Sequence, residues 1–138
     1  MKKITGLLIG VLIAVMVISC KAAEVPVLTL TGAAEVSFTQ SELESMEMVE
    51  SEYTNKDDEV TTYEGILIKG ILENGGADDF NSLKIIASDG YSAEATAEEL
   101  DDCSRCILAF DEENGWRTVM PGFSSKLQVR DVVELSVK

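Results

Sequence analysis

Three cysteines have the clearest capacity for chemistry, because the chain contains no histidine. Without histidine there is no Ser-His-Asp or Cys-His catalysis, no His-ligated zinc and no c-type haem attachment. Cys103 and Cys106 have the C-x-x-C spacing, which supplies half of a four-ligand zinc site or a redox dithiol. Cys20 follows an apolar segment and lies far from the other two in sequence. The available chemistry is therefore that of a thiol pair and of one thiol near the N-terminus.

The spacing of Cys103 and Cys106 favours a structural role. A redox dithiol typically lies at the N-terminus of a helix, where the helix dipole lowers the thiol pKa. This pair instead follows a predicted short helix and precedes a predicted strand. We therefore expect a disulfide or two buried thiols, with redox chemistry as the alternative, and no metal site. A disulfide that closes so short a loop would stabilise the fold only modestly.

The N-terminal segment predicts export. Lys2 and Lys3 form a short basic region, and residues 4–18 are an apolar run without a charged residue. This run is short for a bilayer span, which needs about 20 residues, and it is typical of the apolar region of a secretory signal. Residues 1–19 are therefore expected to be a signal peptide.

Cys20 is expected to carry a lipid. Residues 17–20, Val-Ile-Ser-Cys, resemble a bacterial lipobox, whose cysteine receives a diacylglyceryl group and becomes the N-terminus after cleavage. Residues 20–24 then form a short tether to a domain at 25–138. An uncleaved N-terminal anchor helix is the alternative. In both cases the domain is expected in the bacterial cell envelope, on the periplasmic side or at the outer face of the cytoplasmic membrane.

The net charge argues against nucleic acid as a partner. The full chain carries −14, and loss of residues 1–19, which hold two lysines and no acid, gives a mature charge of −16. Such a chain has no basic surface to displace counterions from phosphates or to dock on anionic headgroups. The acidic residues are spread along the sequence without the spacing of a calcium loop. The expected partners are the membrane, through the lipid, and an unknown small ligand or envelope protein.

Short strands and short helices alternate along residues 25–138, a length that suits one domain. Thr39 with Glu42, and Thr96 with Glu99, form capping boxes that each open a short helix. A third helix is expected to contain the apolar residues of 66–72 and to end at the glycines that follow. The predicted strands cover residues 25–30, 36–38, 48–54, 60–63, 83–88, 91–95, 107–110, 116–120 and 127–137.

Two of these patterns indicate how the strands are arranged. Asn114 and Gly115 both tolerate positive φ and predict a tight hairpin. Residues 127–137 alternate apolar and polar side chains, apart from Asp131, which indicates one buried and one solvated face. The predicted fold class is α+β: a β-rich single domain with a mainly antiparallel or mixed sheet and short helices.

Five short segments, in this order and spacing, carry a resemblance to a known family. They are Leu-Thr-Leu-Thr-Gly at 28–32, Tyr-Glu-Gly-Ile at 63–66, Ala-Ser-Asp-Gly-Tyr at 87–91, Ile-Leu-Ala at 107–109 before Asn-Gly at 114–115, and Val-Met-Pro-Gly at 119–122. The set resembles the oxidoreductase molybdopterin-binding domain, which has the sulfite-oxidase-like fold. The resemblance covers residues 25–138.

The resemblance implies a molybdopterin cofactor, but the sequence departs from the family where its ligands belong. Enzymes of this family hold molybdenum through a cysteine in the segment that corresponds to residues 48–62, which contains no cysteine here. Ser51 is a conceivable replacement, while Cys103 and Cys106 are expected in the other half of the domain. The pterin is normally held by Arg, His and Lys side chains, and this chain has three arginines, no histidine and a strongly negative charge. We therefore expect no cofactor and no catalytic residues.

A ligand groove, if retained, is expected to be lined by three loops. Glycine permits close approach of a ligand to the backbone, and aromatic rings offer flat contact area. Ser124 and Ser125 follow the third loop and could donate to a small anion, whereas Trp116 and Arg117 are expected to cover the sheet. The alternative is that these loops are tight turns whose aromatic side chains fill the core. The candidate groove residues are Tyr63, Gly65, Asp89, Gly90, Tyr91, Pro121, Gly122, Phe123 and Lys126.

Three classes of function follow from these observations. The favoured hypothesis is a membrane-anchored lipoprotein whose cofactor-free domain serves as a binding or interaction module. The first alternative is a molybdopterin-dependent oxidoreductase or an electron-transfer accessory subunit. The second alternative is a surface lipoprotein with a structural role.

Overall fold

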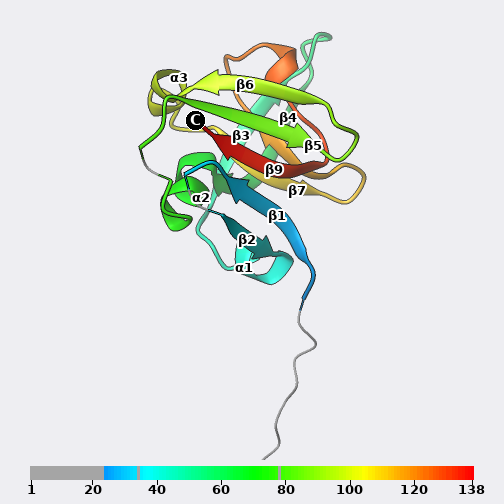
Figure 1. Ribbon diagram of the computed structural model, residues 1–138. Helices are drawn as coiled ribbons and strands as arrows, with labels where there is room; N and C mark the ends of the chain where they lie inside the picture. Colours follow the sequence, from blue (N-terminus) through cyan, green and yellow to red (C-terminus); the bar gives the residue numbers. More distant parts are fainter. Residues whose placement is uncertain (1–23, 34, 78) are drawn as a thin grey trace, which may run out of the picture.

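The computed structural model describes residues 24–33, 35–77 and 79–138 (Figure 1). The expected signal peptide, Cys20 and most of the tether lie outside these residues. Within them, nine strands form two sheets, accompanied by three short α-helices and one 3₁₀ turn. No helix among them has the length and apolar character needed to cross a membrane.

The first sheet is mixed and has five strands in the order β2-β1-β9-β5-β6. Strand β9 lies at its centre and pairs in parallel with β1 and antiparallel with β5. Both outer pairs, β1 with β2 and β5 with β6, are antiparallel. The strands are β1 (Pro26–Thr31), β2 (Val36–Thr39), β5 (Ser82–Ala87), β6 (Ser92–Thr96) and β9 (Val132–Val137).

The second sheet is antiparallel and has four strands in the order β3-β4-β7-β8. Its strands are β3 (Met48–Thr54), β4 (Val60–Leu67), β7 (Ile107–Asp111) and β8 (Gly115–Val119). The main core lies between the two sheets, where Leu30 and Leu135 of the first sheet and Ile66 and Leu108 of the second belong to one buried cluster. The predicted β-rich α+β single domain is confirmed.

The three α-helices close the ends of this core. They are α1 (Gln40–Glu44), α2 (Ile68–Asn74) and α3 (Ala97–Asp101). Both predicted capping boxes form, with Thr39 capping α1 and Thr96 capping α3. Helix α2 ends as predicted at its glycines. Gly76 has a φ of 77°, its N–H donates to the Glu73 carbonyl, and the Ala77 N–H donates to the Leu72 carbonyl. Its predicted start is wrong, since Ile66 and Leu67 belong to β4.

Of two other local predictions, the hairpin at Asn114-Gly115 is confirmed and the last strand is corrected. Strands β7 and β8 pair around a three-residue loop, and Gly115 has positive φ whereas Asn114 does not. Asn114 donates a hydrogen bond to the Asp111 carboxylate, which with the backbone N–H of Glu113 lowers the pKa of that carboxyl. Residues 127–137 are not one strand, because Asp131 has a φ of 53° and β9 begins only at Val132.

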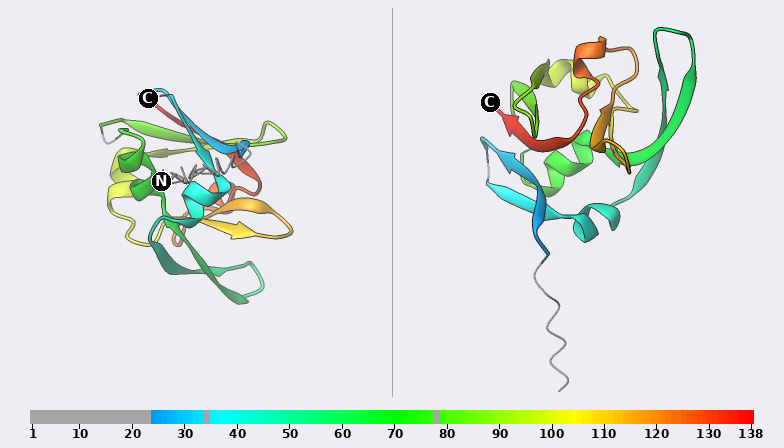
Figure 2. Two further views of the ribbon diagram at one scale, coloured as in Figure 1. Left: turned by 90° about the horizontal axis from the view of Figure 1, so that it is seen from below. Right: turned by 90° about the vertical axis from the view of Figure 1, so that its right-hand side faces the viewer.

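The first half of β4 leaves the sheet as part of a two-stranded ribbon. All seven residues of β3 pair with β4, whereas only Gly65 to Leu67 of β4 pair with β7. We call Met48–Leu67 the β3–β4 ribbon; its tip extends beyond the rest of the sheet (Figure 2). An isolated two-stranded hairpin is marginally stable in water. The ribbon therefore needs further contacts to hold its position.

Gly65 lies where the ribbon meets β7, inside a strand and not in the loop that the sequence predicted. A Cβ placed there would come within 2.4 Å of the Leu108 carbonyl oxygen. Glycine is required at this position because of the close contact between two backbones. The prediction of a 63–65 loop that could line a groove is wrong for this reason.

Gly65→Ala is expected to destabilise the domain by about 2 kcal/mol, because the new methyl group forces two paired strands apart. Gly70→Ala is the matched control. Gly70 lies inside α2, where the nearest atom to a new Cβ is 3.8 Å away, so alanine should be neutral or stabilise by up to about 1 kcal/mol. Urea unfolding of both variants tests this. Equal effects of the two substitutions would contradict the proposed packing role of Gly65.

Candidate functional site

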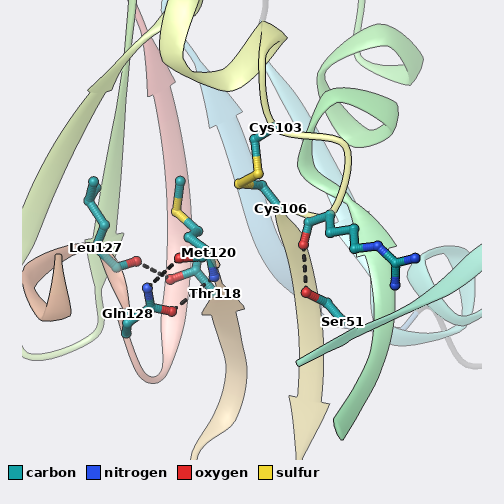
Figure 3. The surroundings of a disulfide bond; sticks show 8 residues. Ser51, Cys103, Cys106, Thr118, Met120, Leu127 and Gln128 are labelled. Atoms are coloured by element: carbon teal, nitrogen blue, oxygen red, sulfur yellow. Dashed lines mark hydrogen bonds between the residues drawn. A yellow bond between two sulfur atoms is a disulfide. The ribbon is translucent and has the colours of Figure 1, made fainter. Parts of the chain in front are cut away.

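The C-x-x-C pair forms a disulfide between α3 and β7 (Figure 3). The capping box at Thr96 fixes the start of α3, and the Cys103 N–H donates to the Leu100 carbonyl where that helix ends. Cys106 is 3% exposed and belongs to the main core, whereas Cys103 is half-buried at its margin. The two cysteines therefore differ in their exposure to solvent.

The loop closed by this disulfide is attached to β3. Ser51 is fully buried, and its Oγ donates to the Arg105 carbonyl at 2.7 Å (Figure 3). In return, Nη1 of Arg105 donates to the Glu50 carbonyl at 3.3 Å. The cysteine pair was expected in the other half of the domain from residues 48–62. That expectation is wrong, because the disulfide loop contacts this segment through Ser51 and Glu50.

A second set of contacts holds the ribbon from the side of β8. The guanidinium carbon of Arg117 lies 4.7 Å from the ring centre of Tyr63 and 5.5 Å from that of Tyr53. Its Nη1 also donates to the Tyr63 hydroxyl at 3.1 Å. Arg117 is 4% exposed, and its Nε has no hydrogen-bond partner among the described residues. The cation–π contacts with the two rings, the hydrogen bond to Tyr63 and the charge of Asp111 together compensate for burying this charge.

Tyr63 and Gly65 thus act within the fold and do not form part of a groove with the other candidate residues. Tyr63 packs, with Tyr53, against a small second core of Ile107, Ala109 and Val119. This core lies on the face of the second sheet that the ribbon partly covers. No local pattern in the sequence indicates this arrangement, because Arg117 lies 54 positions from Tyr63.

A pocket of about 700 Å³ opens beside the disulfide. Part of its wall is the end of α3 with the disulfide loop, and the rest is the segment after β8. The candidate groove residues of the third loop, 121–123, are all here. The lining residues are Glu99, Asp102, Cys103, Ser104, Arg105, Pro121, Gly122, Phe123, Ser124 and Leu127.

The pocket segment 121–127 is held by two polar side chains that the sequence analysis missed. Gln128 accepts from the Met120 N–H at 2.9 Å and donates to the Met120 carbonyl at 2.7 Å (Figure 3). Thr118, which is fully buried, donates to the Leu127 carbonyl at 2.6 Å. These hydrogen bonds join the two ends of the pocket segment, which are not connected by a regular pair of strands. No local pattern in the sequence indicates them.

Three of the remaining candidates lie at the β5–β6 turn, and the fourth, Lys126, lies in the 3₁₀ turn Ser125–Leu127. Gly90 has a φ of 90°, and Asp89 accepts from the Tyr91 N–H at 2.9 Å, so these residues make a tight turn. The Tyr91 hydroxyl donates to the Lys126 carbonyl at 2.7 Å. This turn therefore touches the pocket segment through the backbone of Lys126. Asp89, Gly90, Tyr91 and Lys126 are not among the residues that line the pocket.

A smaller groove of about 370 Å³ lies between α2 and the start of β3. Its floor includes Ile66 and Leu67, and its rim includes the exposed carboxylates of Glu47 and Glu73. The rim favours cations over anions. None of the candidate residues from the sequence analysis lines this groove.

The side chains near residues 48–62 do not fit a molybdenum–pterin group. Ser51 is turned toward the Arg105 carbonyl, and both sulfur atoms of the nearby cysteines are in the disulfide. Arg117 is buried between two tyrosines and is not directed at a pocket. In the described part of the chain, no three His, Cys, Asp or Glu side chains gather where they could hold a metal ion. A thiolate ligand and a set of free guanidinium donors are both lacking at this place.

Comparisons with known proteins support the fold. No protein-family model and no curated protein matches the chain. Among solved structures, it is similar to the sulfane dehydrogenase SoxCD from Paracoccus pantotrophus, with a TM-score of 0.68 and 16% sequence identity. The chain therefore shares its fold with part of this SoxCD chain. The match covers 80% of this chain but only 37% of the SoxCD chain, so it establishes the fold and not the activity.

A double-mutant cycle tests the contact between the disulfide loop and β3. Ser51→Ala should cost about 1 kcal/mol of unfolding free energy, and the double substitution Cys103→Ser with Cys106→Ser about 2 kcal/mol. Because the disulfide positions the carbonyl that Ser51 binds, the combined variant should lose less than the sum, by about 0.5 kcal/mol or more.

Ser45→Ala is the matched control for this cycle. Its hydroxyl also donates to a backbone carbonyl at 2.7 Å, that of Glu42, but it is exposed at the end of α1. Its effect should add to that of disulfide removal. If the effects of Ser51→Ala and of disulfide removal also added strictly, this would show that the disulfide does not position Arg105.

Proposed function

We propose that this chain is an exported lipoprotein, anchored to a membrane through Cys20, whose domain at 25–138 serves as a cofactor-free binding or interaction module. The ligand is a small molecule or another protein of the cell envelope. The domain keeps a fold that molybdopterin oxidoreductases use, while its side chains near residues 48–62 serve to hold the β3–β4 ribbon in place.

One observation carries the cofactor-free part of the proposal. Ser51, the conceivable ligand in the segment where the family has its cysteine, is fully buried and donates its hydroxyl hydrogen to the Arg105 carbonyl. Binding a metal through Oγ would require Ser51 to give up this hydrogen bond, which contributes about 0.5–1.5 kcal/mol. The negative charge of the chain further opposes an anionic cofactor.

The test is the metal and pterin content of the full chain after export from a host that makes molybdopterin. Elemental analysis and pterin fluorescence should both give values far below stoichiometric, because no thiolate is available as a ligand. A molybdopterin enzyme exported by the same host is the positive control. Near-stoichiometric molybdenum would overturn the proposal and favour an oxidoreductase.

The anchoring part of the proposal rests on the lipobox-like residues 17–20. Cys20→Ala should abolish incorporation of labelled fatty acid, because the thiol that accepts the diacylglyceryl group is gone. The variant should then accumulate as the precursor or appear in the soluble fraction. Cys103→Ser is the control and should remain membrane-bound. Labelling of the Cys20→Ala protein to the level of the parent would exclude lipidation at this residue.

A further inference from the structure

Of the two cysteines in the disulfide, one lines the larger pocket. Cys103 lines that pocket and is half-buried, whereas Cys106 is 3% exposed and does not line it. Thiol–disulfide exchange requires a thiolate to reach one sulfur atom, and its rate depends on access to that atom. A thiol in the pocket therefore meets Cys103 and not Cys106.

We propose that the pocket beside the disulfide is a thiol-exchange site at which a small thiol attacks Cys103. The thiolate of the small molecule forms a bond with Sγ of Cys103 while the bond between Cys103 and Cys106 breaks. Cys106 leaves with the electron pair and takes a proton from water. The products are a mixed disulfide on Cys103 and a free thiol on Cys106. A second molecule of the thiol can release Cys103, which leaves two thiols and the disulfide of the small molecule.

The surroundings of the pocket indicate which thiols it prefers. Glu99 and Asp102 line it and are both exposed, and the whole chain carries a net charge of −14. Arg105 is the basic residue of that lining, and its charge offsets one of the two carboxylates. A negative field raises the local concentration of cations and lowers that of anions. The site therefore favours thiols with a positive charge, of the aminothiol class.

Exchange at Cys103 has a structural consequence, because the disulfide loop holds the β3–β4 ribbon. The covalent bond limits the positions that Arg105 can adopt, and Arg105 contacts both Glu50 and Ser51. Once the disulfide is opened, the hydrogen bonds to Glu50 and Ser51 are left to hold Arg105 against the ribbon. The redox state of the disulfide at the pocket thus affects how firmly the ribbon is held. This effect depends neither on lipidation nor on the absence of a cofactor.

The first experiment uses the native full-length protein and two thiols of similar size. Cysteamine is cationic and 2-mercaptoethanesulfonate is anionic. After acid quenching and digestion, mass spectrometry should find the mixed disulfide on Cys103. At low salt, and per thiolate, cysteamine should react about tenfold faster, with a difference that shrinks as salt screens the field. A mixed disulfide on Cys106, or equal rates with both thiols, would overturn the proposal.

A second experiment tests the pocket itself with neighbouring serines. Ser124 lines the pocket and makes no capping hydrogen bond, whereas Ser125 is exposed and does not line it. Ser124→Trp should slow the reaction with cysteamine at least about fivefold by filling the approach to Cys103. Ser125→Trp should react at the parental rate. The same rate in both variants would show that the thiol does not arrive through the pocket.

A third measurement separates the two sulfur atoms. The Cys106→Ser variant keeps only the Cys103 thiol of the pair and should form an adduct with cystamine under native conditions. The Cys103→Ser variant keeps the buried Cys106 and should react at least about tenfold more slowly. Faster reaction at Cys106 would contradict the assignment of Cys103. If circular dichroism shows that either variant is unfolded, the position of the mixed disulfide in the native protein, from the first experiment, decides which cysteine is attacked.

Discussion

The position of the β3–β4 ribbon depends on the contact between β3 and the disulfide loop. Three residues of β4 pair with β7. In the rest of the ribbon, the strand pairing is between β3 and β4 alone. The Ser51 hydroxyl and the Arg105 guanidinium form one attachment, and Arg117 between Tyr53 and Tyr63 forms the other. Because a buried donor without its partner is costly, the Ser51 bond fixes where the ribbon can lie.

These attachments engage Ser51, Arg105 and Arg117 within the fold. A fold similar to that of the SoxCD chain here contains a serine and a disulfide loop that hold each other, and a buried arginine that packs against two tyrosine side chains. Folds are reused for unrelated functions because function depends on the site and not on the architecture. The same disulfide that secures the ribbon also borders the larger pocket, so the pocket lies beside one of the attachments of the ribbon.

Local patterns in the sequence predicted most of the elements, because capping boxes and alternating strands depend on near neighbours. Thr39 and Thr96 open helices as expected, and the cysteine pair lies between a helix and a strand. The failures depend on distant contacts. Gly65 was assigned to a loop because its strand partner, Ala109, lies far along the chain. The pairing of Ser51 with Arg105, 54 positions away, has no local signal at all.

Native-state hydrogen exchange in the oxidised and reduced protein tests the central role of the disulfide loop most directly. The account predicts that reduction lowers the protection of β3 amides, since β3 is attached to that loop, while the amides of β5 and β9 in the other sheet keep theirs. Equal protection of β3 in the two states would contradict it, as would an equal loss of protection in all three strands.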